Sequence, residues 1–195
     1  MKRWRWLVVG VLGLSLHSQA QTPRHYALEV LIFSRPNLVS LQDEAWPSEA
    51  PAAPMSLNLV SAARSGYDNL VLLPARRRTL SDAAYQIRMR MNGSVLFHER
   101  WIHPLTPNQA ANPWLRVDGE GRDGGRLSGF LRWSIDRFIE VDADLRLAFT
   151  DPLTQEQRVF QITEFRKLSS KDIHYLDHPA FGMIIQADPI EGPDG

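Results

Sequence analysis

Imidazole and carboxylate side chains are concentrated in one short segment, where His174, Asp177 and His178 fall within five positions. Two histidines and an aspartate can hold Zn²⁺ with one coordination position open. Their i, i+3 and i+4 spacing converges only in a helix, which Pro179 disfavours, and no HExxH motif accompanies them. We therefore interpret the segment as a turn in which Asp177 accepts hydrogen bonds from local backbone N–H groups. Metal binding or acid–base chemistry is the alternative.

A second group of charges follows the alternation of a strand. Glu140, Asp142 and Asp144 would share one face of that strand, about 7 Å apart, in a spacing that could suit a cation. Arg132 and Arg146 can lie on the same face of the predicted hairpin. Cross-strand ion pairs are therefore the favoured interpretation of this row.

Other patterns typical of enzymes are missing from the sequence. It contains no GxSxG motif and no P-loop, and the glycines between positions 119 and 125 do not lead from a strand into a helix. Cysteine is absent, which excludes disulfides, thiolate nucleophiles and a lipidated N-terminal cysteine. We expect a protein without catalytic activity, cofactor or bound metal.

Exposed aromatic side chains could instead bind a sugar, because pyranose rings pack their apolar faces on them. Trp46 and Trp114 fall in predicted loops and are the first candidates, followed by Trp101 and Tyr175. For Trp101, inside a predicted strand, a core position is favoured. Arginine outnumbers lysine 17 to 2 after residue 20, which suits carboxylate recognition, although a biased genome composition is the favoured explanation.

The elements that would position these residues are mostly strands. The apolar run 26–33 predicts a central strand covered on both faces, and residues 34–75 predict a long surface loop rich in proline. Apolar residues at helical spacing between Leu80 and Met91 predict a helix, with Thr79 and Asp82 as a capping box and Asn92-Gly93 as its stop. Further strands are predicted at 94–102, 127–135, 139–147, 158–168 and 181–187, with a second loop at 104–125.

Together these elements predict an α+β fold, with an antiparallel or mixed sheet of about six strands, one main helix packed on one face, and long Pro-rich loops. Residues 21–187 are expected to form a single domain, and residues 188–195 a flexible tail.

The first twenty residues have the features of a cleaved signal peptide: a basic start, an apolar run over 7–16, and Ser18-Gln19-Ala20 at the cleavage site. Cleavage after Ala20 leaves 19 basic against 22 acidic residues, a net charge of about −3. A charge this small gives no reason to expect nucleic-acid binding. We expect a soluble periplasmic protein without membrane insertion.

The sequence also resembles the CsiV family of periplasmic cell-shape-integrity proteins of gammaproteobacteria. The similarity spans most of the chain after residue 20 and lies in the 26–33 strand, the acidic Trp-Pro at 43–47, the 95–104 segment, the 129–147 hairpin and, most specifically, Ile173-His174-Tyr175-Leu176-Asp177-His178-Pro179-Ala180-Phe181-Gly182. Two positions depart from the family pattern: His103 stands in place of Gln, and 165–168 lacks an expected arginine pair.

What this resemblance implies is a non-enzymatic peptidoglycan-binding protein of cell-wall assembly, which acts with a lipoprotein activator of a bifunctional penicillin-binding protein. It assigns no binding residues. Two alternatives remain at this point: a metal-assisted periplasmic hydrolase using His174, Asp177 and His178, and an adaptor that binds only proteins.

Overall fold

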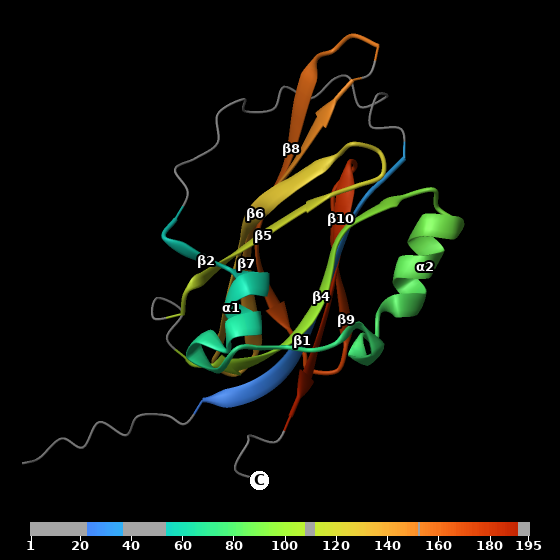
Figure 1. Cartoon of the computed structure of the whole chain (residues 1–195). Coiled ribbons are helices and arrows are strands. Elements are labelled where there is room, and N and C mark those ends of the chain that lie inside the picture. Colours follow the sequence, from blue (N-terminus) through green and yellow to red (C-terminus); the bar gives the residue numbers. More distant parts are fainter. Residues whose placement is uncertain (1–22, 37–53, 108–111, 152, 191–195) are drawn as a thin grey trace, which may run out of the picture.

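The computed structural model describes residues 23–36, 54–107, 112–151 and 153–190. These form two five-stranded sheets that lie face to face (Figure 1). The first sheet has the order β3 (Val71–Leu72), β4 (Ser94–Leu105), β1 (Arg24–Ser34), β10 (Phe181–Pro189), β9 (Ile173–Asp177). The second has the order β2 (Ser56–Asn58), β5 (Trp114–Glu120), β6 (Arg126–Ile135), β7 (Ile139–Thr150), β8 (Gln157–Leu168). Neighbouring strands are antiparallel except β2 and β5, which are parallel.

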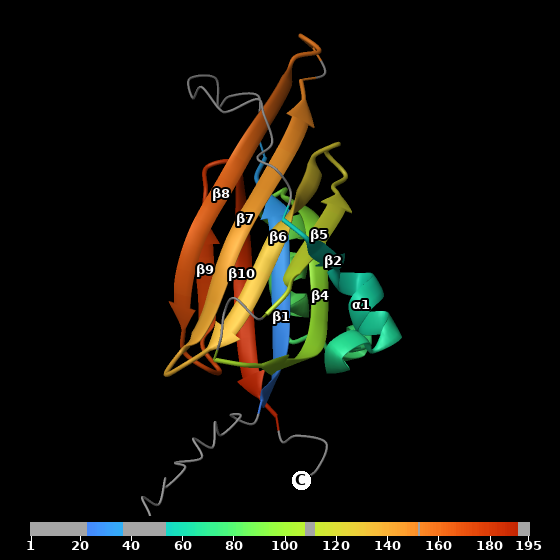
Figure 2. The same ribbon diagram turned by 90° about the vertical axis from the view of Figure 1, so that its left-hand side faces the viewer.

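The expected combination of strands and helices is therefore confirmed, but the expected single sheet of about six strands is wrong. Figure 2 shows the second sheet from its outer face, with β8, β7, β6 and β5 side by side in front of the first sheet. Residues that alternate along a strand show which face is apolar, but not which sheet covers that face. The division of the strands into two sheets could therefore not be predicted from the sequence pattern.

The core lies between the two sheets and follows the alternation of the β6–β7 hairpin. The apolar residues of this hairpin point inward, and its polar residues form the outer face, as predicted. Trp101 of β4 and Trp133 of β6 meet edge to face across the core, with ring centroids 6.0 Å apart. Both side chains are fully buried, which confirms the core assignment of Trp101.

Strand β1 is buried on both faces, as its apolar run predicted. Leu28, Val30 and Ile32 belong to the core between the sheets. Leu31 and Phe33 pack on the other side with residues of α2 (Ser81–Met89). Helix α2 thus covers the outer face of the first sheet at β1 and β4, which confirms one main helix on a sheet face.

The ends of α2 differ from the predicted capping. No side chain from the helix segment caps its N-terminus. Instead Glu29 of β1, which is 1% exposed, accepts hydrogen bonds from the backbone N–H groups of Thr79 (2.7 Å) and Leu80 (2.9 Å). The predicted capping box is therefore wrong, because a carboxylate distant in sequence satisfies these amides. The chain does leave the helix through Asn92, which has a left-handed φ of 51°.

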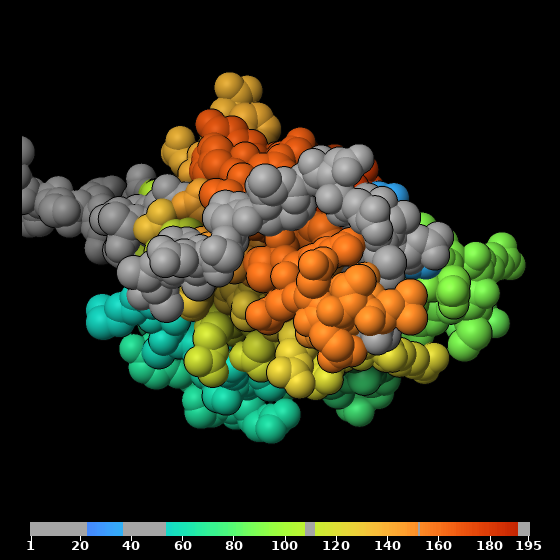
Figure 3. All heavy atoms as spheres, turned by 90° about the horizontal axis from the view of Figure 1, so that it is seen from above, coloured from blue at the N-terminus to red at the C-terminus, as the bar shows by residue number. Residues whose placement is uncertain are grey.

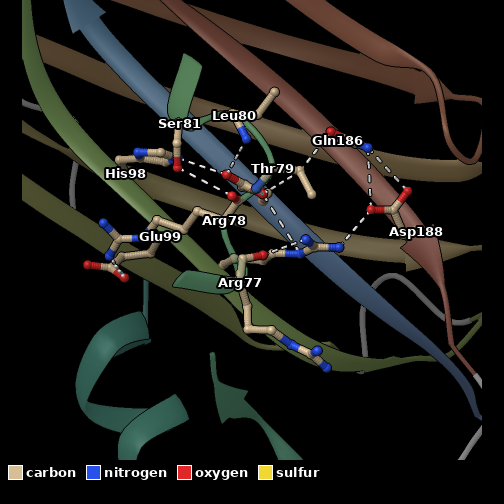
Figure 4. Close-up of polar contacts among 11 residues, drawn as sticks. Arg77, Arg78, Thr79, Leu80, Ser81, His98, Glu99, Gln186 and Asp188 are labelled. Atoms are coloured by element: carbon tan, nitrogen blue, oxygen red, sulfur yellow. Dashed lines mark hydrogen bonds and ion pairs between the residues drawn. The ribbon is translucent and has the colours of Figure 1, made fainter. Parts of the chain in front are cut away.

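Glu29 is the centre of a larger polar network, of which Figure 4 labels Thr79, Leu80, His98 and Asp188 among others. The hydroxyl of Thr79 and Nε2 of His98 also hydrogen-bond its carboxylate, at 2.7 and 2.8 Å. Arg100 binds the backbone carbonyl of Arg77 at 2.6 Å and the carboxylate of Asp188 at 2.8 Å. These contacts join β1, β4 and β10 to the segment that enters α2.

The predicted surface loop at 34–75 is wrong for its described second half. This part contains β2, α1 (Leu59–Ser65), a 3-10 turn (Tyr67–Asn69) and β3, and a second 3-10 turn follows at Ala75–Arg77. Leu59, Ala62 and Ala63 of α1 are buried in the core. Figure 3 shows α1 (teal) and α2 (light green) on different sides of the molecule. Trp46 lies outside the described residues.

The second predicted loop, 104–125, is also shorter than expected. Strand β4 continues to Leu105, and β5 begins at Trp114, because Leu115 and Val117 reach the core. Strand β10 extends to Pro189, two residues into the predicted tail, and the N–H of Ile190 donates to the carbonyl of His25 at 3.0 Å. Across the described ranges, every helix falls short of the length and apolarity that crossing a membrane requires.

Candidate functional site

Strand β9 separates the histidine and carboxylate groups of its segment instead of gathering them. Successive side chains of a strand point to opposite faces, so His174 and Asp177 lie on different sides of the first sheet. His174 contacts the backbone of Ser169 through Nε2, at 3.1 Å from the amide nitrogen and 3.0 Å from the carbonyl oxygen. A metal site formed by His174 and Asp177 is not assembled by this geometry.

His178 follows the end of β9 and packs inward. Its Nδ1 accepts a hydrogen bond from the N–H of Ala180 at 3.0 Å, and its ring lies beside Phe181 and Phe160, with centroid distances of 5.3 and 6.1 Å. Nowhere in the described ranges do three histidine, aspartate or glutamate side chains come together as a metal would require. The hydrolase alternative has no assembled site in this part of the chain.

Asp177 meets two other side chains on the outer face of the first sheet. Nη2 of Arg35 donates to Oδ1 of Asp177 and, at 2.7 Å, to the hydroxyl oxygen of Tyr175. The Tyr175 hydroxyl donates in turn to Oδ1 of Asp177 at 2.7 Å. We call these three residues, Arg35, Tyr175 and Asp177, the Tyr175 cluster. The predicted turn is therefore wrong for residues 173–177, which form β9 because they pair with β10. One local contact that it implied is present, since a hydrogen bond from the His178 N–H helps to lower the pKa of Asp177.

Three neighbouring strands position the cluster. Arg35 directly follows β1, and its backbone N–H donates to the carbonyl of Ala180 at 2.8 Å, which ties it to the turn before β10. The Tyr175 ring is nearly parallel to that of Phe33, at 8° and a centroid distance of 6.3 Å. A Cβ at Gly182 of β10 would come within 2.8 Å of the ring. The tyrosine therefore lies across the sheet above a position that only glycine leaves free.

The three side chains keep their ordinary charges. Burial and the hydrogen bond to Asp177 raise the pKa of Tyr175, so the phenol stays neutral. The hydrogen bond from Tyr175 lowers the pKa of Asp177 despite partial burial, and Arg35 lowers it further. Partial burial works against the Arg35 charge, but Tyr175 and Asp177 outweigh it and raise the arginine pKa. The cluster presents a phenol, a cation and an anion.

This arrangement is accessible and suits a polyhydroxylated ligand. Tyr175 is 43% exposed, and the Asp177 side chain is 62% exposed while both of its side-chain partners use Oδ1. A sugar ring can pack its C–H face on the tyrosine. A hydroxyl at its rim can accept from the arginine and donate to the carboxylate, and such charge-assisted hydrogen bonds are stronger than neutral ones.

Trp114 lies in a different environment, on the outer face of the second sheet. The Arg132 guanidinium sits over its ring, 4.4 Å from the centroid, and donates to Asp142 at 2.8 Å. One ring face is thus already covered within the protein. The cross-strand interpretation of the acidic row is confirmed for Arg132, whereas Arg146 forms no ion pair with any residue that the structure describes.

The other two carboxylates of the acidic row also have protein partners. Glu140 accepts from Ser134 at 3.2 Å and lies 3.6 Å from Nζ of Lys167, and Asp144 accepts from Gln161 at 2.8 Å.

Two members of the Tyr175 cluster, Tyr175 and Asp177, were predicted from the sequence as candidate site residues, whereas Arg35 was not. Arg35 lies 142 positions before Asp177, and no local pattern connects them.

Comparison with known proteins identifies a family. The profile of a family described as "Peptidoglycan-binding protein, CsiV" matches residues 6–190. No curated protein and no solved structure matches the chain.

Proposed function

The chain belongs to the CsiV family of peptidoglycan-binding proteins, and from this premise we propose that it binds peptidoglycan through the Tyr175 cluster. The observation that carries the proposal is the convergence of an accessible tyrosine ring with an arginine and a carboxylate from separate parts of the chain. Trp114 is a weaker candidate, because it is less exposed than Tyr175 and its ring faces the Arg132 guanidinium instead of a free donor and acceptor.

The glycan strand is the part of peptidoglycan that this geometry fits best. A sugar offers an apolar ring face and hydroxyl groups together, and the cluster offers a ring beside a donor and an acceptor. Arg35 is already paired with a carboxylate of the protein, so a stem-peptide carboxylate would compete with Asp177. A sugar hydroxyl can bridge Arg35 and Asp177 without breaking their ion pair.

The proposed setting is the periplasm, reached after removal of residues 1–20. There the protein would act as a non-enzymatic accessory of cell-wall assembly, together with a lipoprotein activator of a bifunctional penicillin-binding protein. Support for this setting comes from the family membership and from the signal-like N-terminal sequence.

Retention on purified sacculi tests the proposal. The mature protein is expected to co-sediment with sacculi, and Tyr175→Ala to weaken binding about tenfold, equivalent to about 1.4 kcal/mol. Gly182→Ala keeps all three side chains but displaces the ring, so it should weaken binding as well. Tyr85→Ala is the matched control, because Tyr85 is an exposed tyrosine on α2.

Two results would contradict the proposal at different levels. If the wild-type protein is retained no better than an unrelated periplasmic protein, peptidoglycan binding itself is wrong. If Tyr175→Ala and Tyr85→Ala bind equally well, the protein binds peptidoglycan elsewhere. Competition with soluble glycan oligomers, but not with free stem peptides, is the result expected for a glycan site.

A further inference from the structure

Among the strands that the structure describes, β8 forms one edge of the second sheet. In the strand order of the described residues its one neighbour is β7, and its 12 residues make it as long as β7 itself. Figure 2 shows β8 at the margin of this sheet. The outer side of such a strand carries backbone N–H and C=O groups that can pair with a further strand.

The second half of this edge carries side chains suited to pairing. Ile162 and Leu168 point toward the core, whereas Phe165 points to the outer face and is 49% exposed. Glu164 and Arg166 form an ion pair with each other along the edge, with side chains 30% and 46% exposed. Phe165 lies midway between these two opposite charges.

This spacing makes the edge complementary to itself. If two copies of β8 run antiparallel about an axis at Phe165, Glu164 of each copy lies opposite Arg166 of the other, and the two Phe165 rings are directly opposite. Opposite charges and aromatic pairs facing across strands are stabilising. Residues that face each other in this register have the same parity, so the inner face of one sheet continues the inner face of the other.

Neighbouring registers are penalised. If one strand slides by two residues in one direction, Glu164 lies opposite Glu164 of the other copy. If it slides by two residues in the other direction, Arg166 lies opposite Arg166, and both arrangements are like-charge contacts. Registers with residues of opposite parity would turn the core side of one sheet to solvent. The charges at this edge therefore favour the register centred on Phe165 over its neighbours.

We infer that the β8 edge, residues 162–168, pairs with the same edge of a second copy and joins the two five-stranded sheets into one continuous sheet. This inference does not depend on the proposed peptidoglycan site, which lies on the other sheet. The paired segment is short and falls at the small end of protein interfaces, below about 1,200 Å². The dimer should accordingly form at micromolar or higher concentration and dissociate on dilution.

Sedimentation equilibrium of the full mature chain tests this inference. The wild-type protein should shift from monomer to dimer as its concentration rises from about 1 to 500 μM, in the range where small interfaces associate. Glu164→Arg places two arginines opposite each other, and Arg166→Glu places two glutamates opposite each other. Each variant alone should weaken dimerisation at least tenfold.

The decisive arm mixes these two variants. In the mixture every facing pair is again of opposite charge, so heterodimers should form with an affinity close to that of the wild-type dimer. Arg146→Glu, a charge reversal on the outer face of the same sheet but away from the edge, is the control and should dimerise normally. Thermal unfolding confirms that each variant is folded, since the altered side chains are partly exposed.

A wild-type protein that stays monomeric over the whole range would overturn the inference. So would dimers that neither single reversal weakens, because their interface would then lie elsewhere. Failure of the mixture to restore association would show that the facing pairs in the proposed register are wrong.

Discussion

Two carboxylates of this protein show how surroundings decide what the same chemical group does. Glu29 is 1% exposed and is surrounded by donors from Thr79, Leu80 and His98, so it serves the fold. The Asp177 side chain is 62% exposed and shares a hydroxyl and a guanidinium at the surface, so it stays accessible to a ligand. Exposure and partner type, not residue type, separate the structural group from the candidate binding group.

Buried His103 gives a prediction at the residue scale. Burial lowers its pKa from 6.5 to about 3, so the folded protein holds it neutral while the unfolded chain binds a proton below pH 6.5. His103 should therefore leave the free energy of unfolding unchanged above pH 6.5. As the pH falls toward 3, protonation of the unfolded chain should lower this free energy by up to about 1.4 kcal/mol per pH unit. Urea unfolding followed by tryptophan fluorescence between pH 7.5 and 5.0 measures this loss.

The variant His103→Gln isolates the effect. Glutamine can still accept a hydrogen bond from Nε1 of Trp101, which lies 3.2 Å from Nδ1 of His103, but it does not titrate. Its free energy of unfolding should vary less with pH over this range than that of the wild type. An equally steep loss in the variant would assign the acid sensitivity to another group.

At the scale of elements, helix α2 depends on β1 for its N-terminal end. Glu29→Gln removes the negative charge that four donors share, and should lower the free energy of unfolding at pH 7 by about 2–3 kcal/mol. Faster hydrogen exchange at the Thr79 and Leu80 amides should accompany this loss. Glu156→Gln is the control, because Glu156 is exposed, and such surface changes alter stability by less than about 0.5 kcal/mol.

The same carboxylate adds a pH dependence below that of His103. Burial alone would raise the Glu29 pKa, but the hydrogen bonds from His98, Thr79 and Leu80 outweigh it and lower the pKa from 4.5 to about 2. The contribution of Glu29 to the free energy of unfolding is therefore present above pH 4.5 and lost as the pH falls through 2.

If Glu29→Gln and Glu156→Gln unfold at the same urea concentration, the proposal that Glu29 anchors the start of α2 is wrong.

For the whole molecule, the two outer faces of the sandwich have different properties. The outer face of the first sheet carries α2 and the Tyr175 cluster. The outer face of the second sheet carries charged rows whose members largely pair among themselves, and among the described strands β8 forms its edge. Binding of a wall polymer and pairing of two copies would therefore use separate surfaces and could occur together.

Export of the whole chain is the remaining prediction. Cleavage after Ala20 should leave a protein that begins at Gln21, with a net charge of about −3. The intact mass of protein recovered from the periplasm measures the cleavage site directly. Ala20→Arg is expected to block processing, because signal peptidase requires a small residue there. Recovery of an intact N-terminus in the wild type would contradict the prediction.

The sequence by itself determined the local features of this protein. The apolar run of β1, the alternation of the β6–β7 hairpin and the helical stripe of α2 each depend on a periodicity within one segment, and each was found where expected. The family resemblance was also visible in the sequence, and the match over residues 6–190 confirms it. These features were predictable because burial imposes a repeat on neighbouring residues.

Only the tertiary structure decided what lies opposite each apolar or polar face. It divided the strands between two sheets, replaced the Thr79 capping box with Glu29, and turned His174 away from Asp177. It also brought Arg35 to Tyr175 and Asp177 across about 140 positions of sequence. Periodicity tells which side of a strand is apolar, but pairing between distant strands depends on the packing of the whole chain, and the candidate site is a product of that pairing.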